Sequence, residues 1–264
     1  MPLSLTGKVC VITGASSGIG RRTAVDLAAA GAVVCAVARR EPLLAELVAE
    51  LGPGDHSYVA ADVSLRSSAT AIAEHVGRRY GRLDVLINNA GFSLPGTLDA
   101  QDALDDLQAV MATNFFGAAY LTHTLLDLLI ASAPSSVINV ASVAGRLAVP
   151  GSSAYSASKF ALVGWSEALQ PELARQGVHV GLIEPGPVPT EGFPQSALVA
   201  RTWLGFAVAS TADVSRAILG AIERRVPERS VPRWYHLLQL PRVVAPPLYR
   251  WARDRILAGR VEAF

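Results

Sequence analysis

Cysteine, lysine and long apolar runs are all scarce in this sequence of 264 residues. The two cysteines, Cys10 and Cys35, each lie in a run of β-branched residues, which predicts two buried free thiols rather than a disulfide. No apolar run approaches the about 18 residues that a membrane-spanning helix needs. The first residues lack a basic segment followed by an apolar one, which predicts no signal peptide. These absences together predict a protein of the reducing cytoplasm.

Charged residues are also few, at 17%, whereas hydrophobic residues make up 51%, a balance that excludes an intrinsically disordered chain. The formal net charge of +1 gives no basis for binding nucleic acid. The charge is nevertheless unevenly spread. From Arg224 to the end, nine arginines face three acidic residues, so this part carries +6 and the rest of the chain −5.

Strand-like and helix-like segments alternate along the chain with short connections. Apolar, β-branched runs predict strands at residues 8–13, 32–38, 56–60, 83–88, 136–140 and 178–183. Helical patterns that end at glycines or turns predict helices at residues 19–30, 42–51, 65–80, 102–130 and 154–176. This alternation indicates an α/β fold, in which one doubly wound, Rossmann-like parallel sheet carries helices on both faces and residues 1–264 form a single domain.

A glycine-rich turn follows the first predicted strand. Its glycines let the backbone approach a pyrophosphate, and the N-terminus of the next helix offers unpaired N–H donors. The spacing Gly-x-x-x-Gly-x-Gly differs from the commoner Gly-x-Gly-x-x-Gly, and a plain strand-to-helix turn is the alternative. The place of the turn at the head of a βαβ unit favours dinucleotide binding. The candidate residues are Gly14, Ser16, Ser17, Gly18, Ile19 and Gly20.

The end of the second predicted strand carries no acidic residue. Enzymes specific for NAD usually place a carboxylate there to bind the ribose 2′-hydroxyl, whereas this chain has Ala38 followed by Arg39 and Arg40. Guanidinium groups can bind a 2′-phosphate with paired hydrogen bonds. The alternative is a pair of solvated charges at a helix start, which the helix dipole disfavours. The pattern therefore favours NADP(H) over NAD(H).

A tyrosine and a lysine share one face of a predicted helix. Tyr155 and Lys159 are four residues apart, so the phenol and the ammonium project together. A nearby ammonium lowers the pKa of a phenol from about 10 and makes it a usable general acid or base. Ser142, which follows the strand at 136–140, lies on the same carboxyl edge of the sheet and can hold a substrate oxygen. A turn-capping role is the alternative for Ser142.

In these motifs the chain resembles the short-chain dehydrogenase/reductase family, in its compact form of about 250 residues. The match runs from Gly7 to about Thr190. Beside the glycine turn and the Tyr-x-x-x-Lys pair, it includes Asp62-Val63, Asn88-Asn89-Ala90-Gly91, Asn114, Ser142 and Pro185-Gly186. The resemblance implies an oxidoreductase that moves a hydride between a nicotinamide dinucleotide and a carbonyl or alcohol.

The resemblance also implies a role for each matching residue. Tyr155 would be the general acid or base, Lys159 would bind the nicotinamide ribose and lower the pKa of Tyr155, and Ser142 would orient the substrate oxygen. Asn114 would hold a water that relays protons through Lys159, and Asn88 would tie strands together. The remaining cofactor contacts would come from Asp62 and Val63 at the adenine, from Asn89, Ala90 and Gly91 along the cofactor, and from Pro185, Gly186, Val188 and Thr190 at the nicotinamide.

The sequence departs from the family pattern at two places, Glu184 where asparagine is frequent and Pro189 where aspartate is common. Neither departure removes a catalytic group. A non-catalytic dinucleotide sensor is the alternative function, and an epimerase or dehydratase is a third. The five histidines show no spacing typical of metal ligands, so no metal is expected.

Two segments beyond Thr190 bear on the substrate. Residues 190–210 are expected to form a flap over it, and the apolar side chains there indicate a lipophilic substrate or, equally, ordinary packing: Phe193, Pro194, Leu198, Trp203, Leu204 and Phe206. Residues 231–264 form a basic, apolar extension. This extension is expected to touch an anionic membrane or to close over an apolar substrate; the alternative is that it docks on its own subunit or on a neighbour in a homo-oligomer.

Overall fold

The computed structural model describes residues 3–190 and 208–261. Seven strands form one sheet in the order β3-β2-β1-β4-β5-β6-β7, and every neighbouring pair is parallel. Their bounds are β1 Val9–Thr13, β2 Val33–Ala38, β3 Ser57–Ala60, β4 Val85–Asn88, β5 Ser135–Val140, β6 Val178–Pro185 and β7 Glu228–Val231. The predicted doubly wound α/β fold is confirmed. The order reverses between β1 and β4, where open sheets of this kind bind ligands.

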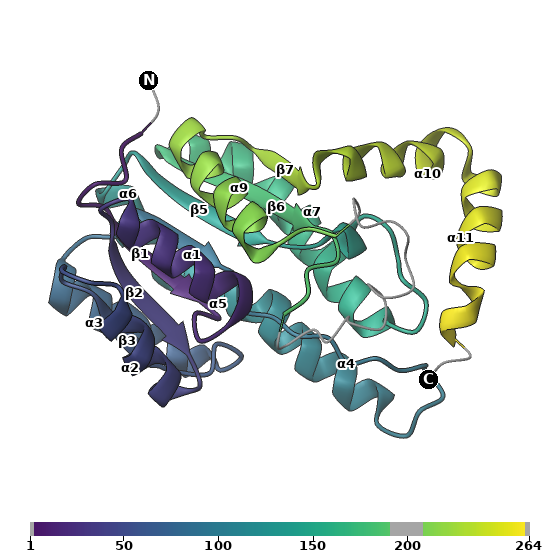
Figure 1. Cartoon of the computed structure of the whole chain (residues 1–264), viewed down its shortest axis with the longest axis horizontal. Helices are drawn as coiled ribbons and strands as arrows, with labels where there is room; N and C mark the ends of the chain where they lie inside the picture. Colours follow the sequence, from purple (N-terminus) through teal and green to yellow (C-terminus); the bar gives the residue numbers. More distant parts are fainter. Residues whose placement is uncertain (1–2, 191–207, 262–264) are drawn as a thin grey trace.

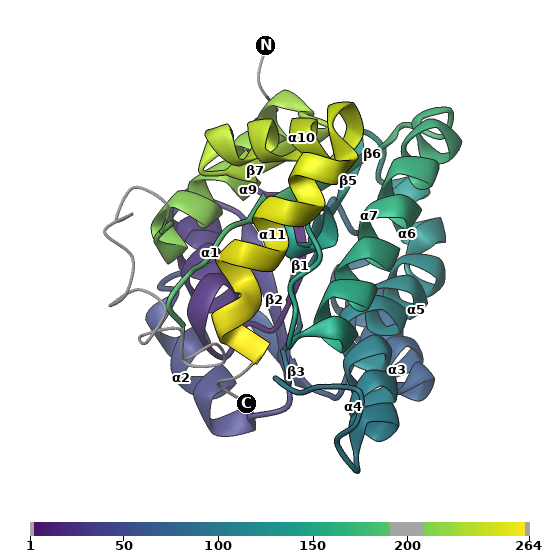
Figure 2. The same ribbon diagram turned by 90° about the vertical axis from the view of Figure 1, so that its right-hand side faces the viewer.

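Helices cover both faces of the sheet (Figures 1 and 2). One face carries α1 (Gly18–Ala29), α2 (Glu41–Glu50) and α9 (Thr211–Arg224). The other carries α3 (Arg66–Tyr80), α5 (Gly117–Thr124), α6 (Leu126–Ala131) and α7 (Ser153–Ala174). Alternate residues of β1 serve the two faces, since Cys10 and Ile12 belong to the first core and Val9 and Val11 to the second. Both faces are therefore apolar, as in a sheet buried on both sides.

The helix predicted at residues 102–130 is interrupted, so that prediction was wrong in detail. The structure has α4 (Ala103–Met111), a π-helical turn η1 (Ala112–Phe116), then α5 and α6 with a break at Leu125. Helical periodicity continues across such a turn, so the sequence pattern does not reveal it. Single π-helical turns inside helices occur frequently at functional sites.

Two elements after residue 207 were not predicted. Helix α9 begins with a capping box, in which Ser210 and Asp213 satisfy each other's backbone N–H groups. Its buried face, with Val214 and Ile218, packs on the core, and β7 then adds the last strand. Beyond β7, a 3₁₀ segment η4 (Arg233–Gln239), α10 (Leu240–Val244) and α11 (Pro246–Val261) lead away from the sheet (Figure 1). No helix within the described ranges is long and apolar enough to cross a bilayer.

Candidate active site

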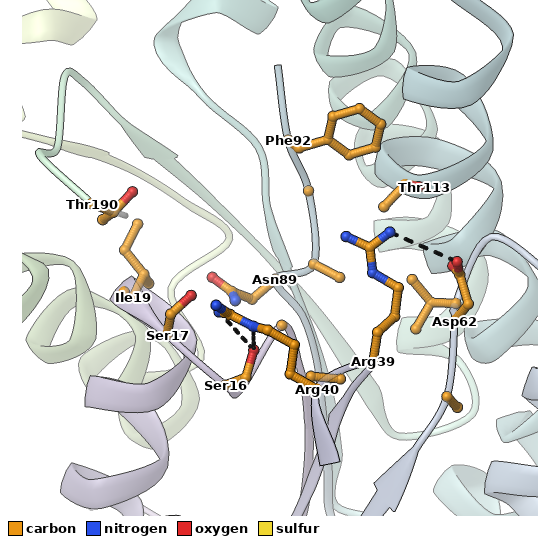
Figure 3. Close-up of a pocket in the computed structure, with 17 residues that line it drawn as sticks. Ser16, Ser17, Ile19, Arg39, Arg40, Asp62, Asn89, Phe92, Thr113 and Thr190 are labelled. Carbon is orange, nitrogen blue, oxygen red and sulfur yellow. Dashed lines mark hydrogen bonds and ion pairs between the residues drawn. The ribbon is translucent and has the colours of Figure 1, made fainter. Parts of the chain in front are cut away.

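A cavity of about 420 Å³ opens at the carboxyl ends of β1, β2 and β4, where the strand order reverses (Figure 3). It gathers most of the cofactor-binding residues expected from sequence, namely Gly14, Ser16, Ser17, Gly18, Ile19, Arg39, Arg40, Asp62, Val63, Asn89, Ala90, Gly91 and Thr190. Gly20, Pro185, Gly186 and Val188 are not among its lining residues. Four lining residues, Ala38, Ala61, Phe92 and Thr113, were not among the expected cofactor contacts.

The glycine turn is shaped by close backbone approaches. Gly14 and Gly18 have φ values of 68° and 56°, a region that residues with a Cβ rarely adopt. A Cβ at Gly20 would collide with the carbonyl oxygen of Gly14. The absence of a side chain at Gly20 therefore lets the backbone of Gly14 pack directly against the first turn of α1. A pyrophosphate site requires such a close approach of the turn to the N-terminus of the helix.

Thr13 fastens the glycine turn to the neighbouring strand. Its Oγ1 accepts hydrogen bonds of 2.9 Å from the backbone N–H groups of Asn89 and Ala90. The side chain of Asn89 donates in return to the carbonyl oxygen of Thr13 at 2.8 Å. The cavity floor is thus fixed from both β1 and β4. Asn88 ties β4 to β5 through a 2.8 Å bond to Asn139, which confirms the role expected for it.

Two arginines stand at the end of the cavity beside β2 and β3 (Figure 3). The guanidinium of Arg40 donates to the hydroxyl of Ser16 in the glycine turn at 3.1 Å. Arg39 is largely exposed and lies 3.9 Å from a carboxylate oxygen of Asp62. No carboxylate occupies the end of β2, which closes with Ala38. Positive charge therefore lies at the end of the cavity beside β2 and β3.

The candidate catalytic side chains meet beside this cavity. A hydrogen bond joins the side chains of Ser142 and Tyr155. The ammonium of Lys159 lies 5.7 Å from the centroid of the Tyr155 ring and donates to the carbonyl oxygen of Val140 at 2.9 Å. Ser142 also caps the turn η2 (Val143–Gly145) by accepting from the N–H of Ala144 at 3.1 Å. Ser142 thus has the capping role considered for it and also lies beside Tyr155.

Burial governs the protonation of this pair. It raises the pKa of Tyr155 to about 12, and the hydrogen bond with Ser142 lowers that pKa only in part. Burial likewise lowers the pKa of Lys159 to about 8. The pKa of Tyr155 is therefore raised and not lowered as expected from Lys159, because desolvation dominates and the opposing effect comes from the hydrogen bond with Ser142. At neutral pH the phenol holds its proton, the state that a general acid needs.

Asn114 lies in the π-helical turn η1 and is 1% exposed. Its amide makes two 2.9 Å hydrogen bonds with the backbone of Phe92 and donates to the hydroxyl of Ser158 at 3.0 Å. A Cβ at Gly91 would lie 3.0 Å from the amide oxygen of Asn114 and 3.4 Å from the ammonium of Lys159. Asn114 thus holds the loop after β4 close to Lys159.

The segment after β6 closes the far side of the site. The N–H of Gly186 donates to the carbonyl oxygen of Val231 at 2.8 Å, and the ring of Tyr235 packs against Gly186. Thr190 reaches back to the glycine turn, where a Cβ at Gly18 would lie 3.1 Å from its methyl group. The side chain of Val188 is buried in the core, so any contact with a ligand would come from its backbone. Most of the expected flap, residues 191–207, lies outside the described residues.

A cluster of ion pairs that the sequence did not reveal lies at the end of the turn η2, which follows Ser142. Arg146, which caps η2, pairs with Glu184 and Glu167 at 2.6 Å each and with Glu228 at 3.1 Å. Glu184, the unusual residue before Pro185, is fully buried and accepts a further bond from Ser230 at 3.0 Å. Potential ligand atoms of Glu184, Glu228 and His236 lie within 4.8 Å of one another, although Glu184 is distant in sequence from the other two. Arg146 already supplies the positive charge there.

Comparison with known proteins agrees with this geometry. The sequence profile of the short chain dehydrogenases matches residues 8–197, which is most of the chain. The chain belongs to the short-chain dehydrogenase/reductase family. This short-chain dehydrogenase/reductase is 32% identical over 263 residues to 11-beta-hydroxysteroid dehydrogenase 1A of Arabidopsis thaliana, covering 94% of this chain and 75% of the relative. It is 35% identical over 200 residues to the 3-oxoacyl-[acyl-carrier-protein] reductase FabG of Thermotoga maritima, covering 74% and 81%.

Solved structures of the family share its fold. A short-chain dehydrogenase/reductase of Burkholderia phymatum in complex with NAD superposes with a TM-score of 0.78 at 30% identity, covering 90% of this chain and 94% of the other. The NADP complex of Pseudomonas aeruginosa RhlG also gives 0.78, at 31% identity and with 85% and 94% covered. This short-chain dehydrogenase/reductase is therefore an oxidoreductase that binds a nicotinamide dinucleotide and a small-molecule substrate.

Proposed function

We propose that the protein is an NADP(H)-dependent carbonyl reductase, or an alcohol dehydrogenase in the reverse direction, with Tyr155 as general acid or base. The observation that carries the proposal is the Ser142–Tyr155 hydrogen bond beside the buried ammonium of Lys159. The described residues fit the cofactor, because a Cβ at Gly20 would fill the turn that cradles its phosphates. A bound nicotinamide dinucleotide supplies or accepts the hydride.

The chain's own groups supply the proton and orient the substrate. The phenol of Tyr155, protonated at neutral pH, donates to the substrate's carbonyl oxygen, and the hydroxyl of Ser142 donates a second hydrogen bond. Removal of one such donor commonly costs a factor of about 100 to 1000 in kcat. Lys159 holds the nicotinamide ribose, and Asn114 positions the water through which protons are replaced. Pro185, Gly186 and Val188 would align the nicotinamide through their backbone.

The preference for NADP(H) rests on Arg39 and Arg40. Both lie at the end of β2, where a carboxylate would repel a 2′-phosphate, and both line the cavity. Of three similar solved structures, one is a complex with NAD and two are complexes with NADP or NADPH, so the choice between the cofactors rests on the two arginines of this chain. The expected lipophilic substrate draws support from the apolar residues at 193–206 and from the steroid named in the Arabidopsis relative. We further propose a homo-oligomer of the cytoplasm, consistent with two free, buried cysteines.

A substrate panel tests this function. Ketones, aldehydes and alcohols are assayed by nicotinamide absorbance with both cofactors, using wild type and Tyr155→Phe. We expect Tyr155→Phe to lose at least about 100-fold in kcat while NADPH still binds by fluorescence. Undiminished activity in this variant would refute Tyr155 as the acid. NADPH binding with no turnover of any substrate would instead favour the dinucleotide sensor.

Arg39→Ala tests the cofactor preference. Loss of charge-assisted hydrogen bonds to a phosphate predicts a rise of about 10-fold to 100-fold in the KM for NADPH, with the KM for NADH little changed. Arg78→Ala is the matched control, because Arg78 is 75% exposed and lies outside the cavity. A preference for NADH that Arg39→Ala leaves unchanged would contradict the assignment.

A further inference from the structure

The chain beyond β7 forms an arm, which we define as η4, α10 and α11, residues 233–261. It continues from the carboxyl end of β7, and α11 stands away from the α/β body in Figure 1 and crosses in front of the sheet in Figure 2. The arm therefore lies off the carboxyl edge of the sheet, the edge at which the cofactor cavity and Tyr155 are found.

Large apolar side chains are exposed along the arm. Seven of the eleven large hydrophobic residues that are exposed in the described part of the chain belong to it, namely Leu237, Leu238, Leu240, Val243, Val244, Leu248 and Trp251. Val243 and Val244 are each 78% exposed, and Leu248 and Trp251 are 58% and 56% exposed. Large apolar side chains exposed in such numbers within one segment indicate a surface that contacts another molecule or a membrane.

Positive charge accompanies these apolar side chains. The arm's sequence contains six arginines, Arg233, Arg242, Arg250, Arg253, Arg255 and Arg260, and one acidic residue, Asp254. Arg253 pairs with Asp254 at 2.7 Å, and the guanidinium of Arg255 lies 5.2 Å from the centroid of the Trp251 ring. From Arg250 to Arg255, basic and apolar residues are interleaved along the helix. Tryptophan and arginine are also enriched in protein–protein interfaces, but six arginines against one acidic residue give the arm a net positive charge that complements anionic lipid phosphates, and interfacial membrane helices combine tryptophan, leucine and arginine in this way.

The base of the arm is fastened to the catalytic segments. The guanidinium of Arg242 donates to the carbonyl oxygen of Arg146 and lies 4.8 Å from the centroid of the Phe160 ring. Phe160 follows Lys159 directly, and Tyr235 of η4 packs against Gly186. These contacts fix η4 and α10, from which α11 continues, relative to the catalytic segments.

We propose that the arm binds the surface of an anionic lipid bilayer and so turns the mouth of the active site toward the membrane. Leu248 and Trp251 enter the headgroup region, and the arginines contact anionic phosphates. The same placement gives the site access to substrates dissolved in the bilayer. This second statement rests on the proposed carbonyl or alcohol oxidoreduction, whereas the binding itself does not.

Co-sedimentation with vesicles tests the binding. We expect the full-length protein to bind phosphatidylcholine vesicles that contain phosphatidylglycerol, less so at high salt, and to bind pure phosphatidylcholine weakly. Arg250→Gln with Arg253→Gln should weaken binding roughly fivefold for each charge removed. Leu248→Glu with Trp251→Glu should weaken it at least as much. The matched controls are Arg78→Gln and Leu65→Glu on α3, where Leu65 is 56% exposed, and they should bind like wild type.

Two results would overturn the proposal. One is wild-type protein that stays in the supernatant with anionic vesicles. The other is a dimer, measured by analytical ultracentrifugation, that Leu248→Glu with Trp251→Glu converts to monomer while vesicle binding is unaffected, because the arm would then be covered by a second copy.

A separate readout addresses substrate access. Tyr155→Phe should bind vesicles like wild type. If wild type binds vesicles but turns over no carbonyl compound, the proposed function is wrong, whereas the proposed membrane-binding surface still stands. With active protein, the arm variants should lower kcat/KM about 10-fold for a bilayer-dissolved ketone and leave it unchanged for a water-soluble one. Equal effects on both ketones would refute access through the bilayer.

Discussion

Lys159 gives the fold an unusual dependence of stability on pH. Its pKa in the folded protein is about 8, because a 4% exposed ammonium has lost most of its hydration, whereas an unfolded lysine titrates near 10.5. The folded state therefore binds this proton more weakly than the unfolded state does. Between pH 8 and about 10.5, the contribution of Lys159 to the free energy of unfolding should rise with pH, by about 3 kcal/mol over the whole interval.

The assay compares wild type with Lys159→Met by urea unfolding of the cofactor-free protein between pH 6 and 10. The free energy of unfolding of wild type minus that of Lys159→Met should be constant below pH 8 and should increase as the pH rises above 8. The series ends at pH 10 because a second group titrates above that pH. The pKa of Tyr155 is raised to about 12 in the folded protein, whereas unfolded tyrosine ionises near 10, so above pH 10 Tyr155 lowers the free energy of unfolding. Two curves that run parallel from pH 6 to 10 would show that the ammonium of Lys159 is not desolvated and would refute the reasoning.

Two further substitutions probe the supports of the site. Arg146→Met leaves the buried carboxylate of Glu184 beside Glu167 and Glu228 without its guanidinium, so the free energy of unfolding should fall by about 3–5 kcal/mol in urea titrations. Adding Glu184→Gln to it should restore part of the loss, and no recovery would contradict the pairing. Gly20→Ala forces a methyl group against the carbonyl oxygen of Gly14, so NADPH binding measured by fluorescence should weaken at least about 10-fold. Gly164→Ala, where a Cβ meets open space, is its control and should bind normally.

Local patterns predicted the parts of the fold and site that depend on neighbours in sequence. The glycine turn and the Tyr155–Lys159 pair could be identified because a tight turn and a helix face are set by spacings of three or four residues. The sheet followed from the alternation of segments, since short connections leave few topologies for parallel strands. The sequence also indicated correctly that Arg39 and Arg40 stand where β2 ends, and the cavity includes both.

Contacts between distant residues escaped the sequence. Arg146 and Glu184 are 38 positions apart and meet only because η2 and β6 end at the same edge of the sheet. The departure from asparagine at Glu184 was visible, but its partner was not. Similarly, the pKa of Tyr155 depends on how deeply the finished fold buries it, a quantity that spacing does not encode, and burial raises this pKa where the spacing to Lys159 had predicted a lowering.

The π-helical turn at Ala112–Phe116 also constrains how this chain can tolerate insertions and deletions. A π turn holds one residue more than an α-helical turn, and each α-helical residue advances the helix by about 100°. Deleting a single residue there would let α4 and α5 join as a regular helix but would rotate Asn114 away from Phe92 and Ser158. Length changes in this stretch are thus coupled to the position of Asn114 beside Lys159, whereas changes in the exposed turn near Gly52 leave these contacts unchanged.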